Sequence, residues 1–248
     1  MYMPLLLKIL YWSSPVLLLP LLCLMVWKRF YRKRPLFFAY VIYEILSISL
    51  VLLVQHQYAL YFYVIWYIIW ADDILTLLVI GEIYREALER YPTLQAVGTR
   101  LFFAATMVLL AASVLIAMSV PGISPDFSRR VSALVVIHRS VLLLQAGLIL
   151  LLVVFTLSLA LPWRGFAKGI ALGLGLATAL QGIPQSLFSA HLIGRGVYDL
   201  VYACGYPCGV VVWLVTGLRA LVFTPAEQAI GPKELETLRR SLNLPPKA

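Results

Sequence analysis

Four ionisable side chains lie deep within long apolar stretches of this sequence: Glu44, Asp72, Asp73 and Arg139. A charged group at the centre of a membrane helix costs about 2.5–3.5 kcal/mol on insertion scales, so each needs a partner, a proton or water. Three carboxyls and one guanidinium leave an excess of two negative charges, which a dry interior does not hold. This excess of negative charge disappears if carboxyls stay protonated, and it is compensated if a cation binds or if water enters from outside. All three outcomes predict a polar cavity.

The depths of these groups in the membrane are comparable. With a rise of 1.5 Å per residue, Glu44, Asp72 and Asp73 each lie roughly 18 Å from the outer ends of their spans. Arg139 lies roughly 12 Å down, and its long side chain reaches deeper. We therefore expect one layer of ligand-binding side chains, made of Glu44, Asp72, Asp73, His138, Arg139, Gln145, Gln181 and Gln185.

Neighbouring residues on a helix point about 100° apart, so Asp72 and Asp73 do not face the same direction. Asp72 shares a stripe with Ile65 and Thr76, whereas Asp73 shares one with Trp66 and Trp70. The layer has three open interpretations: a structural network that fixes helix packing, a ligand or ion cavity, and a proton or substrate pathway.

A metal centre is a weaker hypothesis. His56, His138 and His191 fall in the outer thirds of three different spans, and three histidines near an aspartate could bind zinc. The sequence has no His-x-x-x-His pair, however, and nothing like the Ser and Asp signature of seven-helix metal hydrolases. Gly173-Leu174-Gly175 lies inside an apolar span without a following Lys, so it is not a phosphate loop. We expect no cofactor, no metal and no catalytic residue.

The elements that position these residues are membrane helices. Of the 248 residues, 62% are hydrophobic and 12% charged, against about 25% charged in soluble domains, and the mean hydropathy is +0.92. This composition excludes a soluble globular protein and a disordered chain. Spanning helices need about 20 mainly apolar residues. Seven stretches qualify, at roughly 5–27, 36–56, 59–83, 101–120, 131–160, 168–190 and 197–223. The sequence predicts an all-α, seven-helix transmembrane domain over 1–223 and a cytoplasmic tail over 224–248.

The basic residues set the expected orientation. Lys and Arg number 15 on the side that holds residues 28–34 and the C-terminal tail, and 5 on the other side. The richer side belongs in the cytoplasm, which puts the N-terminus outside and the polar layer in the outer half of the bundle. The net charge of +9 is thus explained by topology and indicates no nucleic-acid binding.

Two further patterns concern helix ends and helix contacts. Thr224-Pro225-Ala226-Glu227 reads as a capping box, and Leu235, Leu238 and Leu242 follow on one face, so we expect a short amphipathic helix on the inner membrane surface. The small-residue spacings Gly169-x-x-x-Gly173 and Gly205-x-x-x-Gly209 favour close helix contact, in folding or in self-association. The tail has no room for an output domain, so a sensor would need a separate partner.

Several motifs carry a resemblance to a known family. They are Tyr61-Phe62-Tyr63 with Trp66 or Trp70, the loop from Glu82-Ile83-Tyr84 to Arg100, His138-Arg139-Ser140, Gln145-Ala146-Gly147-Leu148, Leu161-Pro162-Trp163-Arg164 and Gly169-Ile170-Ala171-Leu172-Gly173. In these motifs the chain resembles uncharacterised seven-helix integral membrane proteins abundant in acidobacterial genomes. The resemblance covers most of residues 60–220. It implies a seven-helix fold in a bacterial cytoplasmic membrane, and it implies no mechanism.

These features favour a membrane-embedded binding or sensory module. Its outer cavity would take a small cationic or amphiphilic ligand, and it would signal through a separate cytoplasmic or membrane protein. Three alternatives stay open: a small-molecule or ion transporter, a structural subunit of a membrane complex, and a metal-dependent intramembrane hydrolase. An enzyme is the less favoured class.

Overall fold

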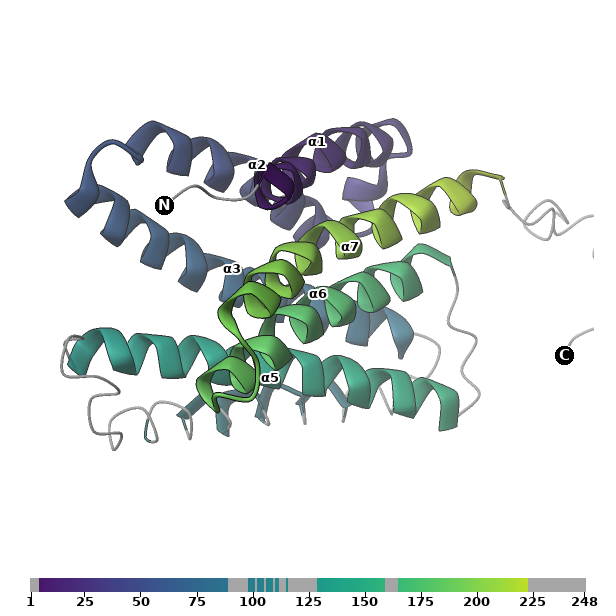
Figure 1. Ribbon diagram of the computed structural model, residues 1–248. Helices are drawn as coiled ribbons and strands as arrows, with labels where there is room; N and C mark the ends of the chain where they lie inside the picture. The colour runs from purple at the N-terminus through teal and green to yellow at the C-terminus, as the bar shows by residue number, and fades with distance from the viewer. Residues whose placement is uncertain are drawn as a thin grey trace, which may run out of the picture.

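A computed structural model describes residues 5–88, 98–100, 102–104, 106–108, 110–111, 115, 129–158 and 165–222. This part of the chain is helical and contains no strand, which confirms the all-α prediction. The helices are α1 (Leu5–Trp27), α2 (Pro35–Val54), α3 (Tyr58–Ala87), α5 (Arg129–Ser158), α6 (Gly165–Ser189) and α7 (Arg195–Val222), with a short 3₁₀ turn η1 (Phe30–Arg32) between the first two (Figure 1).

Five of these helices, namely α2, α3, α5, α6 and α7, are long and apolar enough to cross a membrane. In α1 the apolar part measured in the same way, Trp12–Trp27, is shorter. The fourth expected span, 101–120, is described only in pieces, all of them helical, and the tail 224–248 lies outside the described residues. The count of seven spans and the amphipathic tail helix therefore stay predictions.

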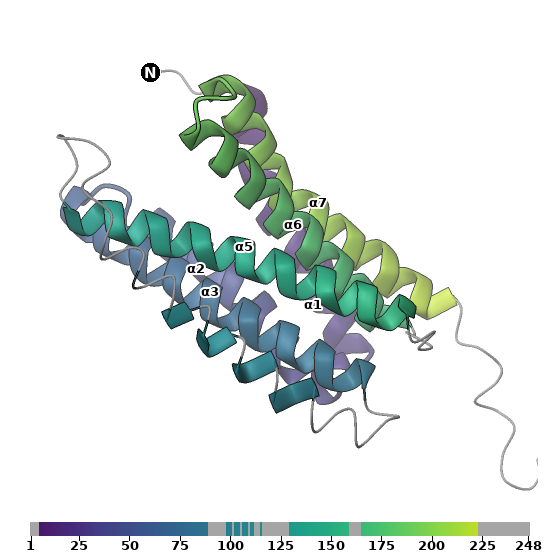
Figure 2. The same ribbon diagram turned by 90° about the horizontal axis from the view of Figure 1, so that it is seen from below.

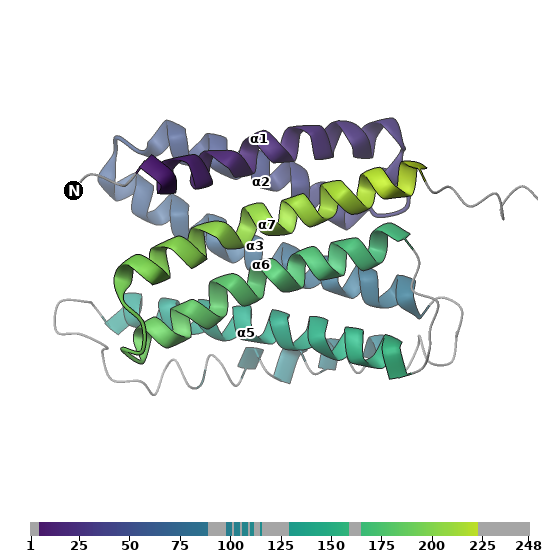
Figure 3. The same ribbon diagram turned by 45° about the vertical axis from the view of Figure 1, so that its right-hand side comes forward.

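Helices joined by a described connection run in opposite directions, whereas α3 and α5 run in the same direction, and the bundle has two distinct ends (Figure 3). The tight connections 55–57 and 190–194 lie at one end, which we call the turn end. The α1–α2 connection, 28–34, lies at the opposite end together with the last residues of α7, and we call it the basic end.

The helices are packed closely near the basic end and spread apart near the turn end. α6 packs most extensively on α7, and α1, α5 and α2 pack on α7, α6 and α3 respectively. Seen from below, α6 and α7 diverge from α2 and α3 toward the turn end (Figure 2). The wedge between the two helix pairs widens in the same direction.

An aromatic cluster fills the narrow part of the wedge. Phe37, Phe166 and Trp213 are buried, and the Phe37 ring lies 5.9 Å from that of Phe166 and 5.2 Å from that of Trp213, both edge-on. The Trp213 indole Nε1 donates to the Ile170 carbonyl at 3.2 Å, which ties α7 to α6. Such edge-to-face aromatic packing leaves little free volume.

The third helix is longer than the sequence indicated, because it continues to Ala87 instead of ending near residue 83. The last two turns of α3 contact the start of α2. The Glu82 carboxylate accepts from the backbone N–H groups of Leu36 and Phe37 at 3.2 and 3.0 Å, and Glu86 binds the Arg34 guanidinium at 2.8 Å. The first N–H groups of a helix have no partner within the helix, and α2 has no side-chain cap of its own.

Candidate functional site

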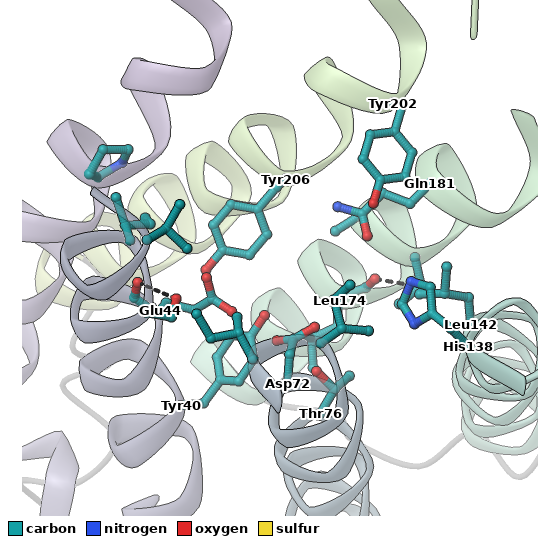
Figure 4. A pocket seen from close by; sticks show the side chains of 18 of the residues that line it. Tyr40, Glu44, Asp72, Thr76, His138, Leu142, Leu174, Gln181, Tyr202 and Tyr206 are labelled. Carbon is teal, nitrogen blue, oxygen red and sulfur yellow. Dashed lines mark hydrogen bonds between the residues drawn. The ribbon is translucent and has the colours of Figure 1, made fainter. Parts of the chain in front are cut away.

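A cavity of about 770 Å³ occupies the wedge, and residues of α1, α2, α3, α5, α6 and α7 line it (Figure 4). Trp12, Gln55 and Tyr61 line it toward the turn end, and Tyr40, Thr76 and Leu174 line it toward the basic end. The cavity therefore extends from the wide part of the wedge to the level of the aromatic cluster.

Four side chains form what we call the carboxyl end of the cavity: Tyr40, Glu44, Asp72 and Tyr206. Figure 4 shows that they point toward one another from α2, α3 and α7. Tyr40 and Glu44 are four residues apart on α2, as are Asp72 and Thr76 on α3, so each helix presents both side chains on one face. This geometry brings two carboxyls and two phenol groups together.

The carboxyl end has unused hydrogen-bonding capacity. The Asp72 Oδ1 atom and the Tyr206 hydroxyl are buried and have no hydrogen-bond partner among the described residues. None of the described residues that line the cavity is Lys or Arg. Buried polar atoms are almost always satisfied in folded proteins, so these two indicate a place for water or a ligand.

A second group, which we call the amide end, consists of Thr178, Gln181 and Tyr202. Thr178 and Gln181 lie on α6 and Tyr202 lies on α7, one turn before Tyr206. The Thr178 hydroxyl donates to the Leu174 carbonyl at 2.9 Å and keeps its lone pairs as acceptors. The amide end is therefore polar without a charged side chain.

Asp73 and His138 form a pair beside the cavity. The His138 Nδ1 atom lies 2.9 Å from Asp73 Oδ2, and the two side chains are 14% and 11% exposed. Gln145, which is buried, donates to the Asp73 backbone carbonyl at 3.2 Å. His138 and Gln145 line the cavity and Asp73 does not, so adjacent Asp72 and Asp73 face different surroundings, as helix geometry predicted.

Besides Asp73, two more of the predicted site residues lie away from the cavity wall. Arg139 donates to the Ser189 hydroxyl at 2.6 Å and forms no ion pair with Glu44, Asp72 or Asp73 among the described contacts. Because His138 faces α3, its neighbour Arg139 is turned toward α6. Gln185 has a buried side-chain oxygen without a partner in the described part of the chain and does not line the cavity. A role in ligand binding stays a prediction for all eight residues.

The tyrosines of the cavity were not among the predicted site residues. Tyr40, Tyr202 and Tyr206 carry no formal charge at membrane depth, although a phenol is both a hydrogen-bond donor and an acceptor. The signal was present in the spacing: Tyr40 lies four residues before Glu44, and Tyr202 lies four residues before Tyr206.

The histidines do not assemble a metal centre within the described residues. His56 and His191 are exposed near the turn end, whereas His138 is paired with Asp73. In that part of the chain no group of three or more His, Cys, Asp or Glu side chains is placed to hold a metal ion. Two carboxyls with two phenols are thus the group of ionisable side chains at one end of the cavity.

Comparisons with protein-family models, with curated proteins and with solved structures give no match to this chain. The cavity is therefore the feature from which we infer a function.

Proposed function

We propose that this protein is a membrane-embedded binding module of a bacterial cytoplasmic membrane. Its cavity takes a small organic cation from the outer side, and its ligand state is passed to a separate protein partner. The observation that carries the proposal is the carboxyl end, where Glu44 and Asp72 face a cavity with no Lys or Arg in its described lining.

The charge of the carboxyl end favours a cation. Ionised carboxyls away from bulk water are costly unless a positive charge compensates them. An ammonium group would supply that charge and donate to Asp72 Oδ1, which has no partner among the described residues. The Tyr40 and Tyr206 rings add aromatic surface beside it, and ring faces attract cations.

The shape of the cavity favours binding over transport. Below Tyr40 the wedge is filled by the aromatic cluster of Phe37, Phe166 and Trp213, each 3% exposed or less. The Tyr40 ring itself lies 6.0 Å from that of Trp213. A transport pathway would need this packed region to open toward the basic end.

The distribution of basic residues supports access from outside. Lys28, Arg29, Arg32 and Lys33 lie at the basic end, whereas the cavity widens toward the turn end. Loops rich in Lys and Arg stay in the cytoplasm, and anionic lipids of the inner leaflet attract them. In this orientation the cavity lies in the outer half, and the basic end is the surface available to a cytoplasmic partner.

A binding experiment tests the proposal directly. Hexylamine, a protonated amine at neutral pH, is titrated by calorimetry into the full chain in lipid nanodiscs. We expect saturable binding that is at least tenfold weaker in the Glu44→Gln/Asp72→Asn double variant, because charge-assisted hydrogen bonds contribute about 1.5–3 kcal/mol each.

The matched control is Asp199→Asn, which removes a carboxylate that lies near Arg195 and outside the cavity. Its affinity for hexylamine should equal that of the unchanged protein. If the folded double variant bound hexylamine as tightly as the unchanged protein does, the carboxyl end would not be a cation site.

A further inference from the structure

We infer that the ligand is an amino alcohol or a molecule of the same two-ended type. Its ammonium would lie at the carboxyl end, its hydroxyl or similar neutral group would lie at the amide end, and an apolar spacer would join them. The inference depends on the proposed function, since it specifies the ligand of the same cavity.

The two ends of the cavity are separate in space. Tyr206 and Tyr202 lie one turn apart on α7, which corresponds to roughly 6 Å along the helix axis. In Figure 4 Glu44, Asp72 and Tyr206 gather on one side, Gln181, Tyr202 and His138 on the other, and Leu174 between them. A ligand that satisfies both ends needs a spacer of several bonds.

The wall between the ends is apolar. Ile69 of α3, Leu142 of α5, and Leu174 and Ala177 of α6 contribute to the lining, and the last three are buried. Apolar surface removed from water contributes about 25 cal/mol per Å², so a methylene chain is the favourable connection. A second charged group in the middle of the ligand would meet no partner there.

The amide end selects a neutral polar group. A primary amide such as that of Gln181 both donates and accepts, whereas the Thr178 hydroxyl, which donates to the Leu174 carbonyl, can only accept from a ligand. His138, which lies on this side of the cavity in Figure 4, is already bonded to Asp73. A hydroxyl, which both donates and accepts, therefore fits better than a second ammonium or a carboxylate.

The volume also argues for an organic ligand. Sites for small molecules commonly measure about 300–1,000 Å³, and the cavity lies within that range. A bare metal ion is not favoured, because the described residues hold no cluster of three metal-ligating side chains.

The test compares a series of probes on the full chain in nanodiscs: aminoethanol, aminobutanol, aminohexanol, hexylamine and hexanediol. We expect aminobutanol or aminohexanol to bind about threefold to tenfold more tightly than hexylamine, the gain of one or two hydrogen bonds. Aminoethanol is too short to reach both ends and should show no gain. Hexanediol, which lacks the ammonium, should bind the most weakly.

Two variants separate this inference from the proposed function. Gln181→Leu keeps the side-chain size and should remove the advantage of aminohexanol over hexylamine, because the hydroxyl loses a hydrogen-bond partner and the alkyl chain of hexylamine does not. Thr178→Val is the second variant at the same end, used if the first does not fold. Glu44→Gln/Asp72→Asn should weaken all amines together.

The outcomes are distinguishable. If every amine binds and depends on Glu44 and Asp72, but no amino alcohol exceeds hexylamine, the two-ended ligand is excluded and the cation site stands. If amines do not bind, or bind without regard to Glu44 and Asp72, the proposed function fails and this inference fails with it. If neither variant folds, the probe series on the unchanged protein decides.

Discussion

Asp72 and Asp73 show how one position along a helix decides what a carboxyl can do. Asp73 is buried, and its side chain is bonded to His138 from α5. Asp72 faces the cavity, with one buried oxygen that has no partner among the described residues. The Asp73 side chain therefore stabilises the fold, whereas the free oxygen of Asp72 can still accept a hydrogen bond from a ligand.

Matched substitutions should therefore have opposite effects on the two aspartates. Asp73→Asn weakens a buried charge-assisted hydrogen bond and should lower the free energy of unfolding by about 1–3 kcal/mol. Asp72→Asn removes a negative charge beside the Glu44 carboxyl and keeps a polar side chain that can still bond to Glu44 and Tyr40, so stability should stay the same or rise. Thermal unfolding of both variants in nanodiscs without ligand measures this. Equal losses would show that the Asp72 carboxyl also stabilises the fold.

The depth of each polar residue along its helix could be predicted from the sequence. The direction in which its side chain faces could be predicted only in part. Rise per residue placed Glu44 and Asp72 at one level, and the structure brings both to one cavity with Gln145 and Gln181. The rise per residue also predicted that Arg139 joins this layer, but its guanidinium donates to the Ser189 hydroxyl instead. Which way a side chain faces depends on the neighbouring helices, and a single sequence does not reveal their order around the bundle.

At the scale of helices, the closest contact is between α6 and α7, and it depends on glycine. A methyl group at Gly209 would lie 2.7 Å from the Gly173 carbonyl oxygen, and one at Gly173 would collide with the Trp213 ring. The spacing Gly205-x-x-x-Gly209 thus brings two backbones of the same chain together. This contact also fixes Trp213, which closes the cavity below Tyr40.

Gly173→Ala should consequently destabilise the bundle, because the added methyl overlaps the Trp213 indole and the α7 backbone. Overpacking of this kind typically costs about 1–3 kcal/mol. Gly147→Ala is the matched control, since a methyl there meets no atom within 4 Å, and alanine favours a helix over glycine by about 0.5–1 kcal/mol. Denaturant titration of the two variants should give opposite signs. A neutral Gly173→Ala would mean that α6 and α7 separate easily.

The whole molecule has two unlike ends, and function follows from the difference. The basic end is held by the Arg34–Glu86 ion pair, the Glu82 cap and the aromatic cluster. The turn end is spread apart and admits the cavity. Composition and hydropathy were sufficient to predict the helices, because lipid-facing and buried faces are both apolar. The spread of the wedge was not predictable, because it arises from the angles at which the helices cross.

Orientation decides which compartment the cavity serves, and cysteine labelling can test it in cells. In a background free of Cys23, Cys204 and Cys208, a single cysteine replaces Leu192, 71% exposed in the α6–α7 connection, or Lys33 at the basic end. We expect an impermeant maleimide to label Leu192→Cys in intact cells and Lys33→Cys only after permeabilisation, since basic loops stay inside. Removing one Lys leaves the charge bias of 15 to 5 nearly unchanged. The reverse labelling pattern would show that the cavity faces the cytoplasm. Its ligand would then have to be an intracellular amine.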